Sequence, residues 1–270
     1  MRQAVLDAFP GFTTPLEGRI PYMYPDTYGY ITTGVGNLID TTPHSNAVTH
    51  TALSLPWVHK SDGQPATADE IAADWQAVSD NADLYHSGGA GAFASLTQLR
   101  LTDDAIDTLV RNKLASNWQQ AVSVYPDAEN WPADAQLALM SMMWAMGMPG
   151  SHFPKFTSAV NGNPPDFNTA AGPPGDAGAD PSRRGQAWIN DSTNPGVRPR
   201  NLANKQLFTN AQAVLDNGVN PDVLYYSKGP DDGQRVDVPT SDNPVSVRSG
   251  LIVGIGLALS IGGIVYLMRS

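Results

Sequence analysis

The chain has 270 residues, of which 41% are hydrophobic, and this is enough for one globular domain with segments left over. Acidic side chains outnumber basic ones by 26 to 16, and the formal net charge of -10 argues against nucleic acid as a partner. Because the chain has no cysteine, disulfides, thiolate nucleophiles and cysteine-ligated metal sites are excluded. The first residues also lack the uninterrupted apolar stretch of a secretory signal.

The first half of the chain shows a strand pattern followed by a helical one. Residues 16–40 alternate aromatic, β-branched and glycine residues, which predicts a short β-ribbon with tight turns. Residues 41–66 contain prolines and glycine without a sustained period, and we interpret them as an irregular insertion. Thr67 and Glu70 have the spacing of a capping box. The helix that they open carries its apolar residues on one face: Ile71, Trp75 and Val78.

The second half is predicted to be helical. A long helix begins at Thr102 and continues to the residue before Pro126, with apolar residues at three- and four-residue spacing. Residues 133–147 are apolar nearly all round and predict a helix at the centre of a lobe. Residues 161–181 are rich in glycine and proline and are interpreted as a loop insertion. Helical periodicity returns at two places: residues 184–190 and 202–215.

The end of the chain predicts a tether and a membrane anchor. Residues 228–249 are polar with several prolines, as in a flexible linker. Residues 250–268 carry no charge, and a helix of that length would span about 28 Å, close to the hydrocarbon thickness of a bilayer. Small residues recur every four positions in this span and could allow helix self-association: Gly250, Gly254, Ala258 and Gly262. We therefore expect a single-pass membrane protein with a lipid membrane as one partner.

Two carboxylates near the β-ribbon suggest chemistry. Glu17 and Asp26 lie nine positions apart, each beside aromatic residues. Glycoside hydrolysis uses such a pair, since one protonated carboxyl donates to the leaving oxygen while an ionised one activates water or stabilises the developing cation. This chemistry needs no cofactor and no metal. By themselves, two carboxylates at this spacing are common, and both could be ordinary surface groups.

The residues around the two carboxylates make the pattern more specific. From Glu17-Gly18, through Tyr24, Asp26 and Gly29, to Thr32, Gly34 and Gly36, the spacing resembles the signature of the phage-type lysozymes, the endolysin family of tailed bacteriophages. Weaker similarity continues over the segments that begin at Leu101, Gln136, Phe153, Trp188 and Arg198, so that the match covers residues 14–215 discontinuously. The resemblance implies an α+β, mainly helical fold of two lobes, a small β-ribbon lobe and a helical lobe, here within a domain of residues 1–227.

The resemblance also implies roles for individual residues. Glu17 corresponds to the family's general acid, Asp26 to its second carboxylate, and Thr32 to the threonine that helps to hold the attacking water. The family typically inverts the anomeric centre, so the two carboxyl groups should lie about 6.5–9.5 Å apart. We expect substrate contacts from four further residues, although Gly34 also suits a purely structural turn: Tyr24, Tyr30, Gly34 and Arg198.

Some residues depart from the family pattern. Asn37 stands where many members have histidine, so an ion pair from that position is absent. Pro10 and Pro15 should interrupt the helix that usually leads into the catalytic glutamate. The insertion at 41–66 is large, and a membrane anchor is unusual for a soluble endolysin.

Several other groups of residues are better explained as structural. The histidines lack the spacing of a metal pair, and ordinary packing or surface positions are favoured for all of them: His44, His50, His59, His86 and His152. A late basic cluster could meet carboxylates of the substrate, but a solvated or salt-bridged helix face is the simpler interpretation: Arg183, Arg184, Arg198, Arg200 and Lys205. Of the ribbon tyrosines, alternation should place about half in packing: Tyr22, Tyr24, Tyr28 and Tyr30.

These expectations lead to a muramidase that cuts the β-1,4 bond between N-acetylmuramic acid and N-acetylglucosamine in bacterial peptidoglycan. A phage origin and a membrane anchor together suggest a lysin in a virion membrane or a host inner membrane, acting in wall penetration or lysis. Two alternatives stay open. One is lytic transglycosylase chemistry, and the other is a non-catalytic, wall-binding structural protein of a virion membrane.

Overall fold

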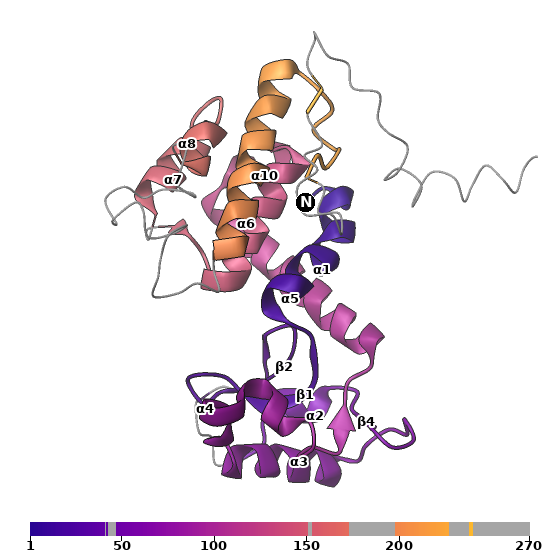
Figure 1. The fold of residues 1–270 in the computed structure, drawn as a ribbon. Helices are drawn as coiled ribbons and strands as arrows, with labels where there is room; N and C mark the ends of the chain where they lie inside the picture. Colours follow the sequence, from indigo (N-terminus) through magenta and orange to yellow (C-terminus); the bar gives the residue numbers. More distant parts are fainter. Residues whose placement is uncertain (41, 43–46, 151–152, 173–197, 227–237, 240–270) are drawn as a thin grey trace, which may run out of the picture.

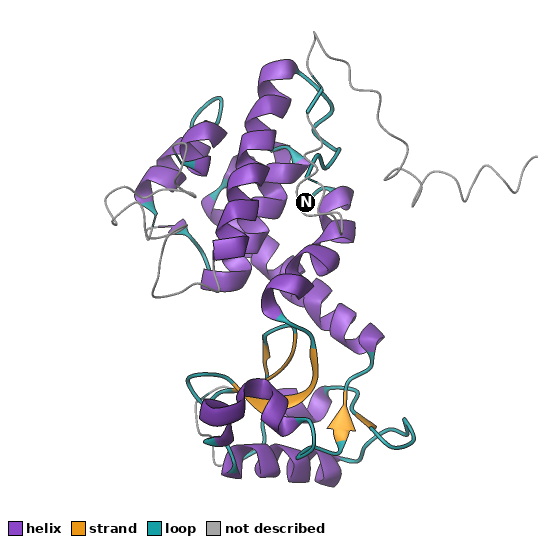
Figure 2. Ribbon diagram, in the orientation of Figure 1, coloured by secondary structure: helices purple, strands orange, loops and turns teal. Residues whose placement is uncertain are grey.

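The computed structural model describes residues 1–40, 42, 47–150, 153–172, 198–226 and 238–239. These residues form two lobes that are joined by one long helix, α5 (Asp103–Val124) (Figure 1). We call residues 18–101 the sheet lobe, and α1 (Gln3–Glu17) together with residues 125–226 the helical lobe. All the strands of the described residues lie in the sheet lobe (Figure 2), so the α+β, mainly helical class is confirmed.

The sheet lobe is built around the predicted β-ribbon. Its three antiparallel strands are β1 (Ile20–Pro25), β2 (Ile31–Gly34) and β3 (Asn37–Leu38), in that order. Tyr24 pairs with Thr32, so their side chains project from the same face of the sheet. The remaining elements of the lobe are short, apart from one helix: α2 (His50–Ser54), β4 (Val58–His59), α3 (Ala68–Asp80), α4 (Leu84–Gly88), a 3₁₀ turn (Gly89–Phe93) and β5 (Leu99–Arg100).

The helical lobe packs around the helix predicted to be central. This helix, α6 (Ala133–Met146), is buried at every position from Ala133 to Trp144. Around it lie α1, α5 and the last long helix, α10 (Arg198–Asn217). Two short helices, α7 (Pro154–Val160) and α8 (Phe167–Ala171), and a 3₁₀ turn at Pro126–Asn130 complete the lobe. Aromatic rings in edge-to-face and stacked contact link α7, α8 and α10 with Tyr125 and Trp131, which flank the 3₁₀ turn before α6.

The predicted helix starts are confirmed in detail. The Thr67 hydroxyl accepts from the Glu70 N–H, and the Glu70 side chain accepts from the Thr67 N–H, which completes the capping box of α3. The Thr102 hydroxyl accepts from the Ala105 N–H at the start of α5. Trp75 of α3 donates its indole N–H to Asp40 at 2.8 Å, and this bond ties the helix to the end of the β-ribbon.

Two segments interpreted as loops contain helices. The segment 41–66 includes α2 and β4, because Trp57 is 2% exposed and its indole N–H donates to the carbonyl of Ala52. The segment 161–181 includes α8, whose Phe167 is fully buried. In both cases an aromatic side chain contributes enough buried apolar surface to order a short segment with weak local signals.

The first helix is also more regular than predicted. α1 continues through Pro10 and Pro15 to Glu17, so the expected interruption is wrong. Val5, Phe9 and Phe12 are buried on one face, and Phe9 packs against Trp144 of α6 with ring centroids 5.1 Å apart. This packing offsets the hydrogen bonds that the two prolines remove.

The prediction of a membrane-spanning fold needs correction. No helix in the described ranges is both long and apolar enough to cross a bilayer. α5 has 22 residues but carries five charged side chains in its first half, while the apolar α6 has 14 residues and would span only about 21 Å. The expected single-pass membrane protein is therefore not borne out. The predicted span at 250–268, with its stripe of small residues, and the linker at 228–249, except for residues 238–239, lie outside the described residues.

Candidate active site

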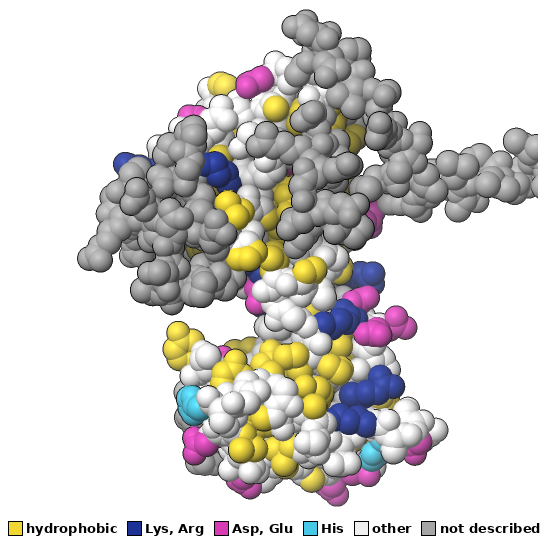
Figure 3. Space-filling model, viewed as in Figure 1, with side chains coloured by type: hydrophobic (Ala, Val, Ile, Leu, Met, Phe, Trp, Pro, Cys, Tyr) yellow, Lys and Arg dark blue, Asp and Glu magenta, His cyan; other side chains and the backbone are white. Residues whose placement is uncertain are grey.

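Glu17 is the last residue of α1 and stands where the chain leaves the helical lobe. Gly18 follows with φ of +81°, a backbone conformation that side chains disfavour, and its N–H donates to the Thr14 carbonyl at 2.9 Å. The chain then enters β1 of the sheet lobe. The space-filling view shows the molecule narrowing to a waist between the two lobes (Figure 3). Glu17 is therefore positioned by a helix end at the junction of the lobes.

The Glu17 carboxylate is held by an arginine from the far end of the sequence. Arg200, in the first turn of α10, donates from Nη2 to Glu17 Oε1. Its other terminal nitrogen, Nη1, donates to the carbonyl and the hydroxyl of Ser141 on α6, both at 3.1 Å. Because Arg200 is only 3% exposed, it provides a fixed charge rather than a solvated one.

A lysine approaches the same carboxylate from α5. Lys113 donates from Nζ to the carbonyl of Gly36 at 3.3 Å, and its ammonium lies 4.0 Å from the ring centroid of Trp144. Gly36 adjoins Glu17, since a Cβ atom placed on Gly36 would lie 3.9 Å from Glu17 Oε2. Two cations therefore surround the carboxylate.

Burial and these cations act on the pKa of Glu17 in opposite directions. Burial of the carboxyl raises the pKa, and it is the largest effect, whereas the charges of Arg200 and Lys113 lower it. The net direction is upward from the ordinary value. A carboxyl group with a raised pKa keeps its proton to higher pH, as a general acid must.

The side chains of Asp26 and Thr32 both form hydrogen bonds with the backbone of Tyr30. Asp26 Oδ1 accepts from the N–H of Tyr28 at 2.8 Å and from that of Tyr30 at 3.0 Å. The Thr32 hydroxyl donates to the Tyr30 carbonyl at 3.2 Å. No donor from the described ranges contacts Asp26 Oδ2, which leaves this oxygen able to accept from water. The turn between β1 and β2 thus brings the second carboxylate and the threonine together.

Tyr24 lies close to both halves of the site. Its backbone pairs with that of Thr32, and the ring is 8% exposed. Burial raises the pKa of Tyr24 to about 12, and the charges of Tyr85, Glu17 and Asp26 contribute to this rise. Both carboxylates therefore lie within electrostatic range of one tyrosine. The expected separation of the carboxyl groups, about 6.5–9.5 Å, stays a prediction.

The other predicted substrate contacts are distributed differently. Tyr30 is half-buried beside Asp26, and Tyr28, at 75% exposure, presents the most accessible ring of the ribbon. Gly34 has a structural role, because a Cβ atom there would lie 3.2 Å from Asn37 Oδ1 and 3.4 Å from a methyl group of Ile106. Arg198 is the first residue of α10, and its side chain lies outside the described structure.

Sequence reasoning missed the cations around Glu17. Lys113 was not singled out, although it falls three residues after Val110 and seven after Ile106, on the buried face of α5. A lysine on an otherwise apolar face was the available signal. Arg200 belongs to the late basic cluster and to the segment beginning at Arg198 that carries the weaker similarity, but nothing local predicts its contact with Glu17. Asn37, in place of a histidine, accepts from the Val35 N–H at 3.3 Å and supports the β2–β3 turn.

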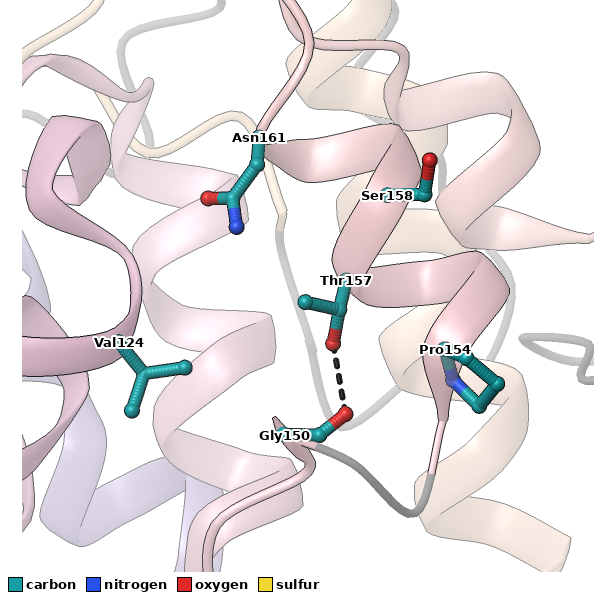
Figure 4. Close-up of a pocket in the computed structure, with 6 residues that line it drawn as sticks. All are labelled: Val124, Gly150, Pro154, Thr157, Ser158 and Asn161. Carbon is teal, nitrogen blue, oxygen red and sulfur yellow. Dashed lines mark hydrogen bonds between the residues drawn. The ribbon is translucent and has the colours of Figure 1, made fainter.

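An open surface pocket of about 540 Å³ lies elsewhere, in the helical lobe (Figure 4). Val124 from the end of α5 lines one side, and residues of α7 line the other. The Thr157 hydroxyl donates to the Gly150 carbonyl at 2.8 Å across its floor. Among the described residues, no charged side chain lines this pocket, and none of its lining residues belongs to the candidate site.

No family model matches the chain, and no curated protein matches it either. The candidate site is therefore defined by its own geometry and by the residue pattern around Glu17.

Proposed function

We propose that the protein is a muramidase that hydrolyses the β-1,4 bond between N-acetylmuramic acid and N-acetylglucosamine in peptidoglycan. The observation that carries the proposal is that two carboxyl groups near the junction of the lobes lie in different environments. Glu17 is half-buried with a raised pKa, whereas Asp26 is held on a turn through one of its two carboxylate oxygens, and the Thr32 hydroxyl bonds to the same turn. Carboxyl groups in such different surroundings suit the two roles of an inverting glycosidase.

In this mechanism, a glycan strand lies across the waist between the lobes. Glu17 donates its proton to the glycosidic oxygen as the bond to the anomeric carbon breaks. Asp26 Oδ2 takes a proton from a water molecule, which attacks the opposite face of the sugar. Thr32 orients this water through its hydroxyl lone pairs, since its proton is donated to Tyr30. Arg200 then stabilises the Glu17 carboxylate that has lost its proton.

The direct test is digestion of purified peptidoglycan by the full chain. We expect soluble muropeptides with new reducing ends, and a folded protein that left the wall intact would contradict the proposal. Glu17→Gln should abolish turnover in a protein that still folds, because the amide oxygen can still accept from Arg200. Glu129→Gln, at an exposed position, is the matched control and should leave turnover unchanged. Equal activity in Glu17→Gln would remove Glu17 from its role.

The alternatives predict different products. A lytic transglycosylase uses a hydroxyl of the sugar in place of water, so its products carry anhydro ends that mass spectrometry identifies. It would also tolerate Asp26→Asn, which should stop a hydrolase. A non-catalytic wall-binding protein would bind peptidoglycan without releasing fragments. An interrupted helix before Glu17 would have favoured this alternative, because it would misplace the catalytic carboxyl group. α1 is continuous to Glu17, so this argument for the alternative is lost.

A further inference from the structure

Lys113 is a half-buried cation whose tip is fixed by two elements that do not belong to its own helix. Its ammonium donates to the Gly36 carbonyl in the β2–β3 turn and lies over the Trp144 ring of α6. A lysine on a protein surface gains little from a single contact, because its side chain loses entropy when it is held. Here the aliphatic stem lies on the buried face of α5 and the charge meets two partners, so the position is well determined.

Lys113 and Arg200 act on the Glu17 carboxylate from different parts of the protein. Arg200 is bound to Ser141, and so it ties the carboxylate to the helical lobe. Lys113 donates to the carbonyl of Gly36, a residue of the sheet lobe that adjoins Glu17 Oε2, and so the β2–β3 turn holds its charge near the carboxylate. Glu17 is therefore paired directly with Arg200 of the helical lobe, while the charge of Lys113 acts on it from a position fixed by Gly36 and Trp144.

The charged and titratable groups that face Glu17 come from three elements. Among the described residues these are Arg200 of α10, Lys113 of α5 and Tyr24 of β1. From α6 the neighbours Ser141 and Trp144 are uncharged. Burial and the charge of Arg200 lower the pKa of Lys113, while Glu17 raises it. The charges of Glu17 and Lys113 therefore depend on each other, and both depend on Arg200.

We propose that Lys113 is a positioning residue for Glu17: its ammonium holds the β2–β3 turn against α5 and places a positive charge near the carboxylate. This inference rests on the proposed function of Glu17 as general acid. Burial raises the pKa of Glu17, and the charge of Lys113 lowers it. Lys113 therefore limits the pH up to which Glu17 keeps the proton that a general acid needs. It also gives the carboxylate, after proton donation, a second cation beside Arg200.

The chain allows a direct titration of the carboxyl group. Its glutamates are Glu17, Glu70 and Glu129, so the full-length protein labelled with ¹³C at the glutamate carboxyls gives few signals, and Glu17→Gln identifies that of Glu17. We expect Lys113→Met to move the titration of Glu17 upward by about one pH unit, since one nearby opposite charge is lost. The high-pH limb of peptidoglycan digestion should move in the same direction.

Two further variants separate charge from packing. Lys113→Arg keeps the positive charge and should leave both the titration and the high-pH limb near those of the wild type. Lys155→Met removes a lysine charge from the exposed face of α7 and should move neither. Urea unfolding of all variants at one pH reports any loss of packing, which would not by itself move a titration.

The outcomes distinguish this inference from the proposed function. An unchanged Glu17 titration in folded Lys113→Met would overturn the assignment of Lys113, whatever the activity. A shifted titration in a protein that never digests peptidoglycan would support the effect of the Lys113 charge on Glu17 but overturn the proposed function. If Lys113→Met fails to fold, a Glu17 titration in Lys113→Arg that departs from the wild type by a full pH unit would overturn the assignment, and an unchanged one would support it.

Discussion

Glu17 and Arg19 stand on either side of Gly18, yet each forms an ion pair with a different part of the protein. Glu17 pairs with Arg200, whose side chain is 4% exposed, and the pair is completed by Ser141. Arg19 pairs with Asp103 at 3.0 Å and Asp107 at 2.8 Å, at the start of α5. The Asp103 side chain is 87% exposed. Two pairs that are neighbours in sequence thus differ mainly in their access to water.

The difference shows how one type of contact serves two purposes. Water competes for the charges of the Arg19 pairs, so these contribute little free energy and mainly orient the chain where it enters β1. The Arg200 pair has lost most of its water, so each partner depends on the other and on Ser141. Removal of one partner should therefore be costly only at the buried pair.

The largest expected effect is that of Arg200→Met. We expect the free energy of unfolding to fall by about 3–5 kcal/mol, because the change leaves Glu17 and the Ser141 acceptors without their donor. Urea unfolding at neutral pH measures the loss. A loss no greater than that of Arg19→Met would show that burial does not separate the two pairs.

A third carboxylate sharpens the comparison, because it is buried without a cation among the described residues. Asp134 is 0% exposed and accepts from the Asn210 side chain at 2.9 Å and the Tyr225 N–H at 2.8 Å. Burial raises its pKa from 3.8 to about 6. The folded protein therefore binds more protons than the unfolded one between these values, and this contribution to stability is lost as pH rises through about 6.

The test compares the wild type with Asp134→Asn at several pH values. Relative to the variant, the wild type should lose about 2–3 kcal/mol of unfolding free energy between pH 4 and pH 7. Any packing defect of asparagine adds an offset that does not depend on pH. A constant difference between the two proteins over this range would contradict the prediction.

A smaller effect is expected from Arg19→Met. The change should lower the free energy of unfolding by no more than about 1 kcal/mol, since the partners of Arg19 are partly or largely solvated. The loss should shrink further in 1 M salt, where exposed charges are screened. The same salt should change the effect of Arg200→Met much less, and similar salt dependence of both variants would count against the comparison.

The smallest expected effect is the difference in stability between variants of the two partners of Arg19. Asp107 is 34% exposed and Asp103 is 87% exposed. We expect Asp107→Asn to destabilise the protein measurably and Asp103→Asn to have less effect, because Arg19 also donates to the Asp103 main-chain carbonyl at 2.9 Å, a bond that the substitution keeps. Thermal unfolding of the two variants in low salt gives the order, and the reverse order would contradict it.

Helices with signals inside a few residues were predictable. The capping box of Thr67 and Glu70, the cap at Thr102 and the apolar run of α6 all act within one helix, so neighbouring residues suffice to identify them. The short elements α2 and α8 were not, because their order depends on the burial of one aromatic side chain each, Trp57 and Phe167. Phe167, for example, packs against Trp131 and Phe208, which are distant in sequence. α1 was misjudged for the same reason: its prolines are local, but its packing against α6 is not.

The candidate site shows the same difference between residues with a local signal and contacts between distant residues. Glu17, Asp26 and Thr32 lie within one short segment, and a spacing pattern could find them. The Arg200 contact with Glu17 joins residues 183 positions apart, and the Lys113 contact with Gly36 joins residues 77 apart. No local pattern predicts such contacts, since they arise only when α5 and α10 pack near the end of α1.

By itself, the sequence determined which groups are available: two carboxylates and a threonine at set spacing, a β-ribbon with turns that need glycine, and helices with identifiable caps. Only the tertiary structure decided the environment of those groups. It paired Glu17 with Arg200, placed Lys113 beside it, and turned Asp26 toward the backbone of Tyr30. The physical reason is that residue type sets ordinary acidity and hydrogen-bonding capacity, while burial and neighbouring charges, which depend on the whole fold, set how each group behaves.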